Sequence, residues 1–296
     1  MPPDFDPNFQ IPHWSWWIVL YFFFGGVTGG LYFAAAWLDL FGERFDRPAM
    51  RVGHFLAFPL LLLCAVFLIV DLGQPLRFWH MIFESENFPT PILKLYSPMS
   101  FGSVLLGIFG LVTFLSFVDA VFGTRWLHAP GNVLGKIVSV IGAIGGLALA
   151  GYTGVLLNVT SEPVWGNSPW VSALFLFSGI STGIAALMLV ARSVPQTTVE
   201  KLSEADNYMM LFELISLIVF LATLGAVGAR FIFGGSTLIL FVVVVVLGLL
   251  VPLALHWRPR LVGNVRGATI ASAVLVLIGG FVLRWAVLAG PQGIGL

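Results

Sequence analysis

The sequence predicts an all-helical integral membrane protein with eight transmembrane helices, arranged as two four-helix bundles. Three observations support this fold class. Hydrophobic residues make up 58% of the 296 residues, and the mean hydropathy is +0.99. Charged residues make up only 9%, against about 25% in a typical soluble domain. So few charges cannot cover a surface that faces water on all sides.

Apolar stretches of about 20 residues, the length that crosses a bilayer as a helix, occur eight times. Runs such as Phe241 to Val246 are continuously apolar, whereas the strands of a membrane β-barrel alternate polar and apolar residues. Gly and Pro interrupt several stretches, which membrane helices tolerate when neighbours satisfy the freed backbone groups. We therefore treat residues 1–296 as a single membrane domain with spans near 15–40, 52–71, 98–122, 133–158, 168–191, 207–229, 234–255 and 266–289.

The positive-inside rule orients these spans. One set of loops contains Arg44, Arg47, Arg51, Arg125, Lys136, Arg192, Lys201, Arg258, Arg260 and Arg266. The opposite set contains only Arg77, Lys94 and Arg230, while Arg284 lies inside the last span. Because Lys and Arg concentrate on the cytoplasmic side, we expect the first set to lie inside and both chain termini to lie outside, in the periplasm.

Charge and cysteine content exclude several classes of function. The formal net charge is 0, which argues against nucleic-acid binding through a basic surface. The single cysteine, Cys64, excludes an intrachain disulfide, a CxxC metal site and covalently attached haem. The sequence contains no GxxxxGK[ST], HExxH or GxSxG motif. We therefore predict no metal site and no iron–sulfur cluster in this protein.

Ionisable and polar side chains inside membrane spans are costly and usually functional. A helix rises about 1.5 Å per residue, and counting from the span ends brings four such residues to the outer third of the bilayer. They are Tyr21, Asp71, Tyr152 and Arg284. Arg77 and His80 follow Asp71 in the next loop. A cluster at one depth from separate spans is a candidate binding site.

Each of these residues also has a structural interpretation. Tyr21 can belong to an interfacial aromatic belt, and Tyr152 lies among small residues that favour close helix packing. Asp71 and Arg77 can form a salt bridge at the end of a span. Arg284 can extend its charged end to the lipid headgroups. His80 can be an ordinary loop residue.

A second set of polar residues lies toward the inner side. It comprises Asp39, His54, Asp119, Glu213 and His256. Most lie near span ends, where solvated side chains are common, but Glu213 lies about two turns into its span. Asp39, His54, Glu213 and His256 together suggest a proton route that leads toward the outer site.

A b-type cytochrome is a further interpretation, because facing histidines can hold haem. Only His54 and His256 share a depth near the bundle interior, and both lie close to the inner side. We therefore expect no haem in this protein. The absorbance difference between reduced and oxidised protein tests this expectation directly.

Four segments of the sequence resemble the NrfD/PsrC family, the membrane subunits of polysulfide reductase-like respiratory complexes. They are 71–80 (DLGQPLRFWH), 151–157 (GYTGVLL) running into 162–165 (EPVW), the glycine-rich 25–30 (GGVTGG), and 288–296 (LAGPQGIGL). The resemblance extends along the whole sequence. Where some relatives have Asn and His early in the first span, this sequence has Ile18 and Tyr21.

The resemblance implies a multi-pass subunit of a bacterial or archaeal plasma membrane that binds menaquinone or ubiquinone. Electrons then pass between the quinone pool and a four-cluster, ferredoxin-like iron–sulfur subunit, with a molybdenum or multihaem catalytic subunit beyond it. By match, Tyr152 corresponds to a tyrosine that donates to a quinone carbonyl, and Asp71 to the acidic residue beside that pocket. Tyr21, Arg77, His80 and Arg284 are the further expected quinone-binding residues.

Two outer loops, 72–97 and 159–168, are the expected docking surface for the iron–sulfur partner, because structured loops of this length usually carry a site or a partner. The alternative for these loops is capping at the membrane interface. The alternative for the whole protein is an ion or small-solute transporter that works through Glu213 and the inner residues without a redox partner. Transport by the isolated protein in liposomes would favour that alternative.

Overall fold

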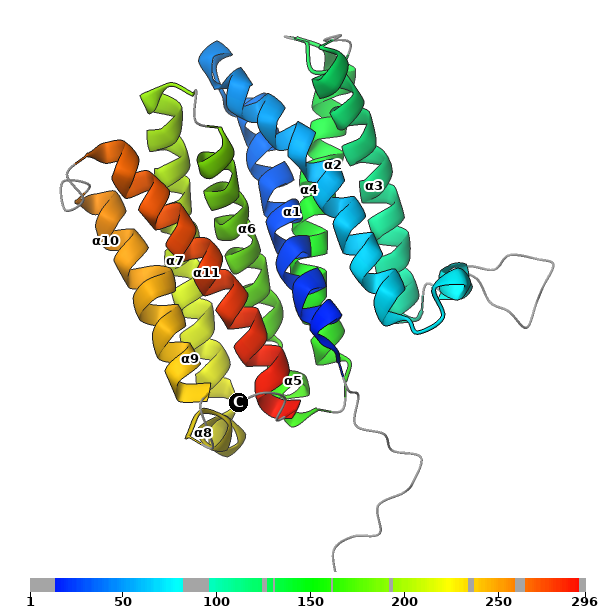
Figure 1. Ribbon diagram of the computed structural model, residues 1–296, viewed down its shortest axis with the longest axis vertical. Helices are drawn as coiled ribbons and strands as arrows, with labels where there is room; N and C mark the ends of the chain where they lie inside the picture. Colours follow the sequence, from blue (N-terminus) through cyan, green and yellow to red (C-terminus); the bar gives the residue numbers. More distant parts are fainter. Residues whose placement is uncertain are drawn as a thin grey trace, which may run out of the picture.

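The computed structural model describes residues 14–81, 96–123, 127–129, 131–160, 162–191, 194–233, 237–258 and 264–292. Within these ranges the protein is helical and contains no strand, and eight of its helical segments are long and apolar enough to cross a membrane (Figure 1). The predicted fold class is therefore confirmed.

The first four spans lie side by side in one half of the molecule (Figure 1). They are α1 (Trp16–Phe41), α2 (Arg47–Asp71), α3 (Pro98–Phe122) and α4 (Val133–Asn158). Two 3₁₀ helices accompany α2, with η1 (Arg44–Asp46) before it and η2 (Pro75–Met81) after it. Ser15 caps the start of α1, because its side chain accepts a hydrogen bond from the backbone of Trp17. We call this half the first bundle.

The other four spans form the second bundle. They are α6 (Trp170–Val190), α7 (Gln196–Thr223), a composite helix of α9 (Thr237–Val243), η4 (Val244–Leu250) and α10 (Val251–Trp257), and α11 (Val265–Gln292). The short helices α5 (Pro163–Gly166) and α8 (Gly225–Phe233) lie in connections. The segment η4 is a π-helix that lies shortly before Pro252, which cannot donate a backbone hydrogen bond.

Helix α1 joins the two bundles and has the largest buried share of the eight spans. It packs against α2 and α4 on one side and against α6 on the other. Glycines permit the closest contacts, because a Cβ on Gly30 would lie 2.0 Å from the carbonyl oxygen of Gly179, and a Cβ on Gly29 would lie 2.3 Å from that of Gly146. Small residues let membrane helices approach in this way.

The sixth span differs from its expected position. Helix α7 begins at Gln196, well before the expected residue 207, and ends at Thr223. Its first turns are polar and extend beyond the apolar stretch that hydropathy detects. The apolar residues after Leu224 belong instead to α8, whose first residue, Gly225, has a positive φ of 54° and so breaks the helix after α7.

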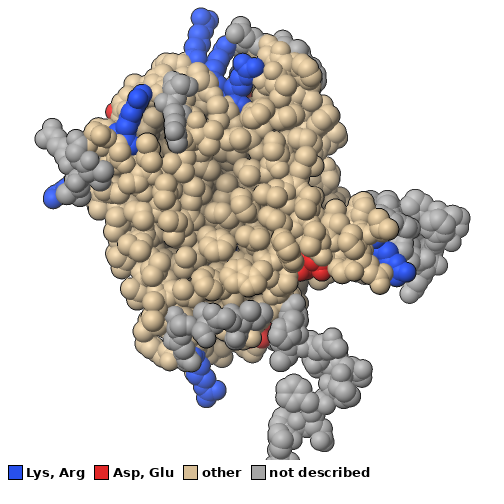
Figure 2. All heavy atoms as spheres, viewed as in Figure 1, with Lys and Arg blue, Asp and Glu red and all other residues tan. Residues whose placement is uncertain are grey.

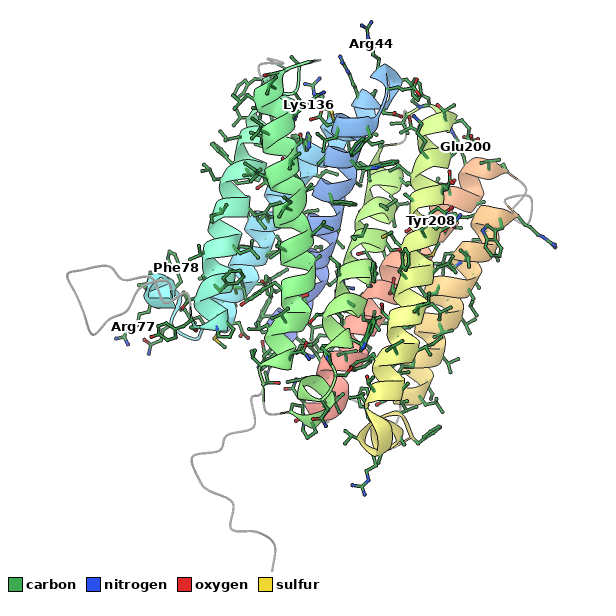
Figure 3. All side chains as sticks on the ribbon, turned by 180° about the vertical axis from the view of Figure 1, so that it is seen from behind. Arg44, Arg77, Phe78, Lys136, Glu200 and Tyr208 are labelled. Atoms are coloured by element: carbon green, nitrogen blue, oxygen red, sulfur yellow. The ribbon has the colours of Figure 1, made fainter. Side chains whose placement is uncertain are left out.

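Helix α1 begins and α11 ends at the same end of the molecule, the lower end in Figure 1. We call this the outer end and the opposite one the inner end, following the predicted orientation. Lys and Arg side chains gather at the inner end in the view of Figure 2, and Arg44 and Lys136 are labelled there in Figure 3. This distribution agrees with the positive-inside argument, and the side of the membrane remains a prediction.

Candidate functional site

Tyr152 lies on α4, within the outer third of the first bundle, and is 7% exposed. Its hydroxyl donates a hydrogen bond to the backbone carbonyl of Pro98, at 2.5 Å, in the first turn of α3. The phenol lies against Gly102, where an added Cβ would come within 2.2 Å of the hydroxyl oxygen. Tyr152 thus places a hydroxyl donor inside an apolar contact between α3 and α4.

Tyr21 lies on α1 and is 2% exposed, so it is a core residue and not part of an exposed aromatic belt. Helix α1 packs against α4 and α2, which carry Tyr152 and Cys64. Tyr21 and Tyr152 therefore lie on neighbouring helices, near the outer end of each.

Asp71 is half-buried at the last residue of α2 and accepts a hydrogen bond from the hydroxyl of Ser15. Within the described residues, Asp71 forms no ion pair with Arg77. Arg77 lies on η2, is exposed and points away from the helix bundle (Figure 3). The side chain of His80 and residues 82–95 of the predicted docking loop lie outside the described part of the protein.

Arg284 is completely buried on α11 and does not extend to the headgroups. Its guanidinium donates to the carbonyl of Phe22 at 3.0 Å, to Ser178 Oγ at 3.0 Å and to the carbonyl of Gly280 at 2.8 Å. A Cβ on Gly26 would lie 2.5 Å from the guanidinium, so this glycine makes room for it. Arg284 therefore lies on the α6 and α11 side of α1, within the second bundle.

Glu213 on α7 is 3% exposed, and its polar neighbours are Ser178 and Arg284. Ser178 accepts a hydrogen bond from Arg284, so a buried carboxyl group, a serine and a buried guanidinium lie close together. Asp206 lies seven residues earlier on the same helix and is fully buried. One of its oxygens accepts from Ser181 at 2.7 Å, and the other has no partner among the described residues.

The sequence analysis overlooked Asp206. The signal was present, because residues seven apart lie on the same face of a helix, and Asp206 and Glu213 have that spacing. Hydropathy counting placed Asp206 just before the expected span and therefore in solvent. The structure instead extends α7 and buries Asp206 against α6.

His256 lies at the inner end of the second bundle, where one ring nitrogen is 2.8 Å from Asn207 and the other is 2.8 Å from Ser272. It lines a hollow of about 260 Å³ that also includes Asn207, Glu200 and Glu204. Polar groups thus occur along the second bundle from this hollow, through Asp206 and Glu213, to Arg284.

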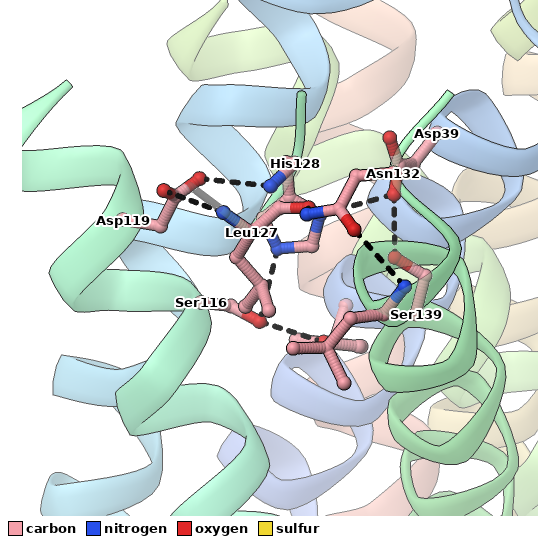
Figure 4. A network of polar contacts seen from close by, with 9 residues as sticks. Asp39, Ser116, Asp119, Leu127, His128, Asn132 and Ser139 are labelled. Carbon is pink, nitrogen blue, oxygen red and sulfur yellow. Dashed lines mark hydrogen bonds and ion pairs between the residues drawn. The ribbon is translucent and has the colours of Figure 1, made fainter. Parts of the chain in front are cut away.

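Asp39 and His54 lie instead in the first bundle, around His128 (Figure 4). Asp119, also counted among the inner residues, accepts hydrogen bonds from the backbones of Leu127 and His128. The residues predicted for one proton route therefore form two groups, one in each bundle. His54 and His256, the pair considered for haem, belong to different groups. Among the described residues, no group of three or more metal-binding side chains is placed to hold a metal ion.

The outer connection between α4 and α6 is tightly anchored. The amide of Asn158 donates to the carbonyls of Trp165 and Ser168, both at 2.8 Å, and the indole of Trp165 donates to the carbonyl of Val287 at 2.7 Å. Partial burial raises the pKa of Glu162 above its usual value, although a hydrogen bond from the backbone of Val164 opposes the shift. This connection therefore presents a rigid surface with one perturbed carboxyl group.

The fold and these buried polar groups define a multi-pass membrane protein with buried tyrosines near one end of its spans. The family model described as "Polysulphide reductase, NrfD" matches residues 7–294. The protein belongs to this family of membrane subunits of reductase complexes. With its eight apolar helices, it is a multi-pass protein of the bacterial inner membrane.

Named relatives agree with this assignment. The polysulfide reductase of Wolinella succinogenes has a chain that is 25% identical, over 94% of each sequence. Protein NrfD of Escherichia coli K12 is 27% identical, over 67% of the present sequence and 65% of its own length. The selenate reductase of Mesobacillus selenatarsenatis has a subunit that is 27% identical, over 60% of the present sequence and 47% of its own length.

Proposed function

We propose that this protein is the quinone-reactive membrane anchor of a respiratory oxidoreductase, which exchanges electrons between the quinone pool and an extrinsic iron–sulfur subunit. The observation that carries the proposal is the position of Tyr152, a buried hydroxyl donor in the motif shared with the family, close to Tyr21 and in the outer third of the bundle. The site suits menaquinone or ubiquinone.

The residues at this site fit a quinone head group. Ligands of this kind require mostly apolar walls and a small number of well-placed polar groups. Tyr152 supplies a donor, and neighbouring rings include Phe101, whose centroid is 6.1 Å from that of Tyr152. Phe101 and Trp17 are 49% and 43% exposed, so apolar side chains near the site face the lipid from which a quinone would enter.

Each residue has a separate role in the proposed reaction. Bound quinone supplies two-electron, two-proton redox chemistry. Tyr152, whose hydroxyl donates to the carbonyl of Pro98, would orient the quinone by donating a hydrogen bond to it. Asp71 holds a proton at its carboxylate, where Ser15 positions the carboxylate by donating to it. Tyr21 forms the wall opposite Tyr152. Arg77 and His80 follow Asp71 in the sequence and would lie on the part of the site that faces the iron–sulfur subunit.

The redox partner must lie outside the membrane domain at its outer end. We propose a four-cluster iron–sulfur subunit that docks on loops 72–97 and 159–168, with a molybdenum or multihaem catalytic subunit beyond it. The rigid connection held by Asn158 and Trp165 supports this surface, because a preformed loop loses little conformational entropy on binding. The names of the polysulfide and selenate reductase relatives support a complex of this type.

Purification of the tagged protein from its native membranes tests this proposal. We expect a stoichiometric iron-rich subunit to co-purify, and we expect a short-chain quinol analogue to reduce its clusters in the assembled complex. An Asn158→Ala variant should weaken the co-purification, because it frees the α4–α6 connection. An iron-free protein that purifies alone and transports an ion or solute in liposomes would favour the transporter alternative.

We also propose that the second bundle moves protons during turnover, through His256, Asp206 and Glu213 toward Arg284. In support, Glu213 and Asp206 are buried carboxyl groups on one face of α7, and Asp206 accepts a hydrogen bond from Ser181 of α6. Burial favours the protonated form of a carboxyl group over the ionised form, so buried carboxyl groups are suited to carry protons.

A Glu213→Gln variant should lose about half of transmembrane proton movement in reconstituted complex, since protons consumed at the tyrosine site do not pass through Glu213. It should retain electron transfer from the quinol analogue within about threefold, because Tyr152 lies in the other bundle. A trapped pH-sensitive dye provides the measurement, and Arg230→Gln, at an exposed charged residue of α8, is the control. Normal proton movement in Glu213→Gln would exclude this route.

A further inference from the structure

A buried hydrogen-bonded network occupies the inner half of the first bundle (Figure 4). The Nδ1 atom of His128 lies 3.0 Å from a carboxylate oxygen of Asp39, and Ser139 donates to the same oxygen at 2.5 Å. The other nitrogen of His128 lies 3.3 Å from Ser116 Oγ, which in turn lies 2.9 Å from the hydroxyl of Tyr32. Asp39, His128, Ser116 and Tyr32 thus form a continuous series of proton-exchanging groups.

This series begins at a hollow that opens at the inner end of the molecule. The hollow has a volume of about 460 Å³ and is large enough to hold several waters. Asp39 and His128 line it, and their side chains are 15% and 4% exposed. Its other charged lining residues are Glu43, Arg44, Arg47 and Lys136. Water can therefore exchange protons with Asp39 and His128 at the base of the hollow.

The series continues toward the outer end along one face of α1. Thr28, Tyr32 and Asp39 are separated from Tyr21 by about two, three and five whole helical turns, so the four residues lie in a single line. Tyr32 and Asp39 are hydrogen-bonded to Ser116 of α3 and Ser139 of α4, and the hydroxyl of Thr28 donates to the backbone carbonyl of Phe24 at 2.7 Å. The line covers about 27 Å, close to the thickness of the hydrocarbon core.

The opposite face of α1 carries Phe22, Gly26 and Gly30, which contact Arg284 and the backbone of α6. Helix α1 therefore separates this polar line from the carboxyl groups of the second bundle. His54 stacks on His128 at a ring distance of 4.2 Å, and both of its ring nitrogens are buried without a partner among the described residues. The network thus includes a second imidazole with unused hydrogen-bonding capacity.

We propose that Asp39 and His128 form the inner entrance of a proton path that supplies the tyrosine site through the first bundle. From this entrance, Ser116, Tyr32 and Thr28 pass protons toward the tyrosine site. The proposal rests on the quinone function proposed above. Each group accepts one proton as it releases another, so no group is consumed. The charged and titratable groups around His128 are Asp39, His54, Asp119, Glu43, Arg44, Arg47 and Lys136.

The test uses the whole complex in proteoliposomes, with a quinone analogue reduced through the partner subunit. A Tyr32→Phe variant keeps the ring packed against Gly142 and Phe109 but removes the hydroxyl from the path. In a Glu213→Gln background, which closes the proposed second-bundle route, we expect at least a tenfold loss of proton uptake from the inner-end side, with a larger solvent deuterium effect on turnover. Tyr208→Phe, at an exposed tyrosine of α7, should behave as the unmodified protein.

A His128→Ala variant gives a second measurement that does not depend on Tyr32. Imidazole added on the inner-end side should enter the hollow and restore at least half of the lost proton uptake. The proton path is wrong if Tyr32→Phe leaves proton uptake from the inner-end side unchanged while the complex still turns over quinone. It is also wrong if imidazole does not restore the proton uptake lost in His128→Ala. If the unmodified complex shows no quinone turnover, the proposed function itself fails, which is a separate result.

Discussion

Replacing Tyr152 with Phe should lower electron transfer from a quinol analogue to the partner clusters by about 100-fold, with the complex fully assembled. Removing one preorganised donor from a buried polar site typically costs a factor of this size. The phenyl ring preserves the packing against Gly102, and only the hydroxyl bonded to Pro98 is lost. The measurement is the rate of cluster reduction per assembled complex, followed by absorbance.

Two further variants test whether the lower electron-transfer rate results from the missing hydroxyl. Tyr208→Phe removes an exposed hydroxyl and should leave the rate unchanged. Gly102→Ala keeps the Tyr152 hydroxyl but forces it to move, because the new Cβ would otherwise lie 2.2 Å from it; we expect a loss of at least tenfold. A wild-type rate in Tyr152→Phe would remove Tyr152 from the proposed site.

Replacing Gly30 with Leu should prevent the protein from folding. The Cβ alone would lie 2.0 Å from the backbone carbonyl oxygen of Gly179, and neither helix backbone can yield without separating α1 from α6. Overpacking a well-packed core costs about 3 kcal/mol and occasionally more, and here the obstacle is backbone and not a flexible side chain. The measurement is the yield of folded protein and its thermal unfolding in detergent.

The matched control is Gly107→Leu on α3, where no atom lies within 4 Å of an added Cβ and the residue is exposed. That variant should fold with normal yield, because the new side chain enters lipid. Equal yields for the two variants would show that the α1–α6 contact is not what joins the bundles.

The eight spans could be predicted from the sequence because crossing a bilayer imposes a length and a composition on each helix. Depth could be predicted in the same way, because helix rise converts residue number into position along the membrane normal. That reasoning placed Tyr21 and Tyr152 at one level, and the helices that carry them, α1 and α4, pack against each other. It placed Arg284 at a similar depth, but this residue lies on the side of α1 that faces α6 and α11.

The sequence alone therefore determined the fold class, the number of spans and the depth of most polar side chains. Only the tertiary structure decided which polar groups share a bundle, so Asp39 and His54 join His128, while Glu213 joins Asp206 and Arg284. The physical reason is that the rotation and neighbours of a helix depend on contacts between distant segments. In this protein those contacts are made by glycines such as Gly30 and Gly179, whose pairing no local pattern reveals.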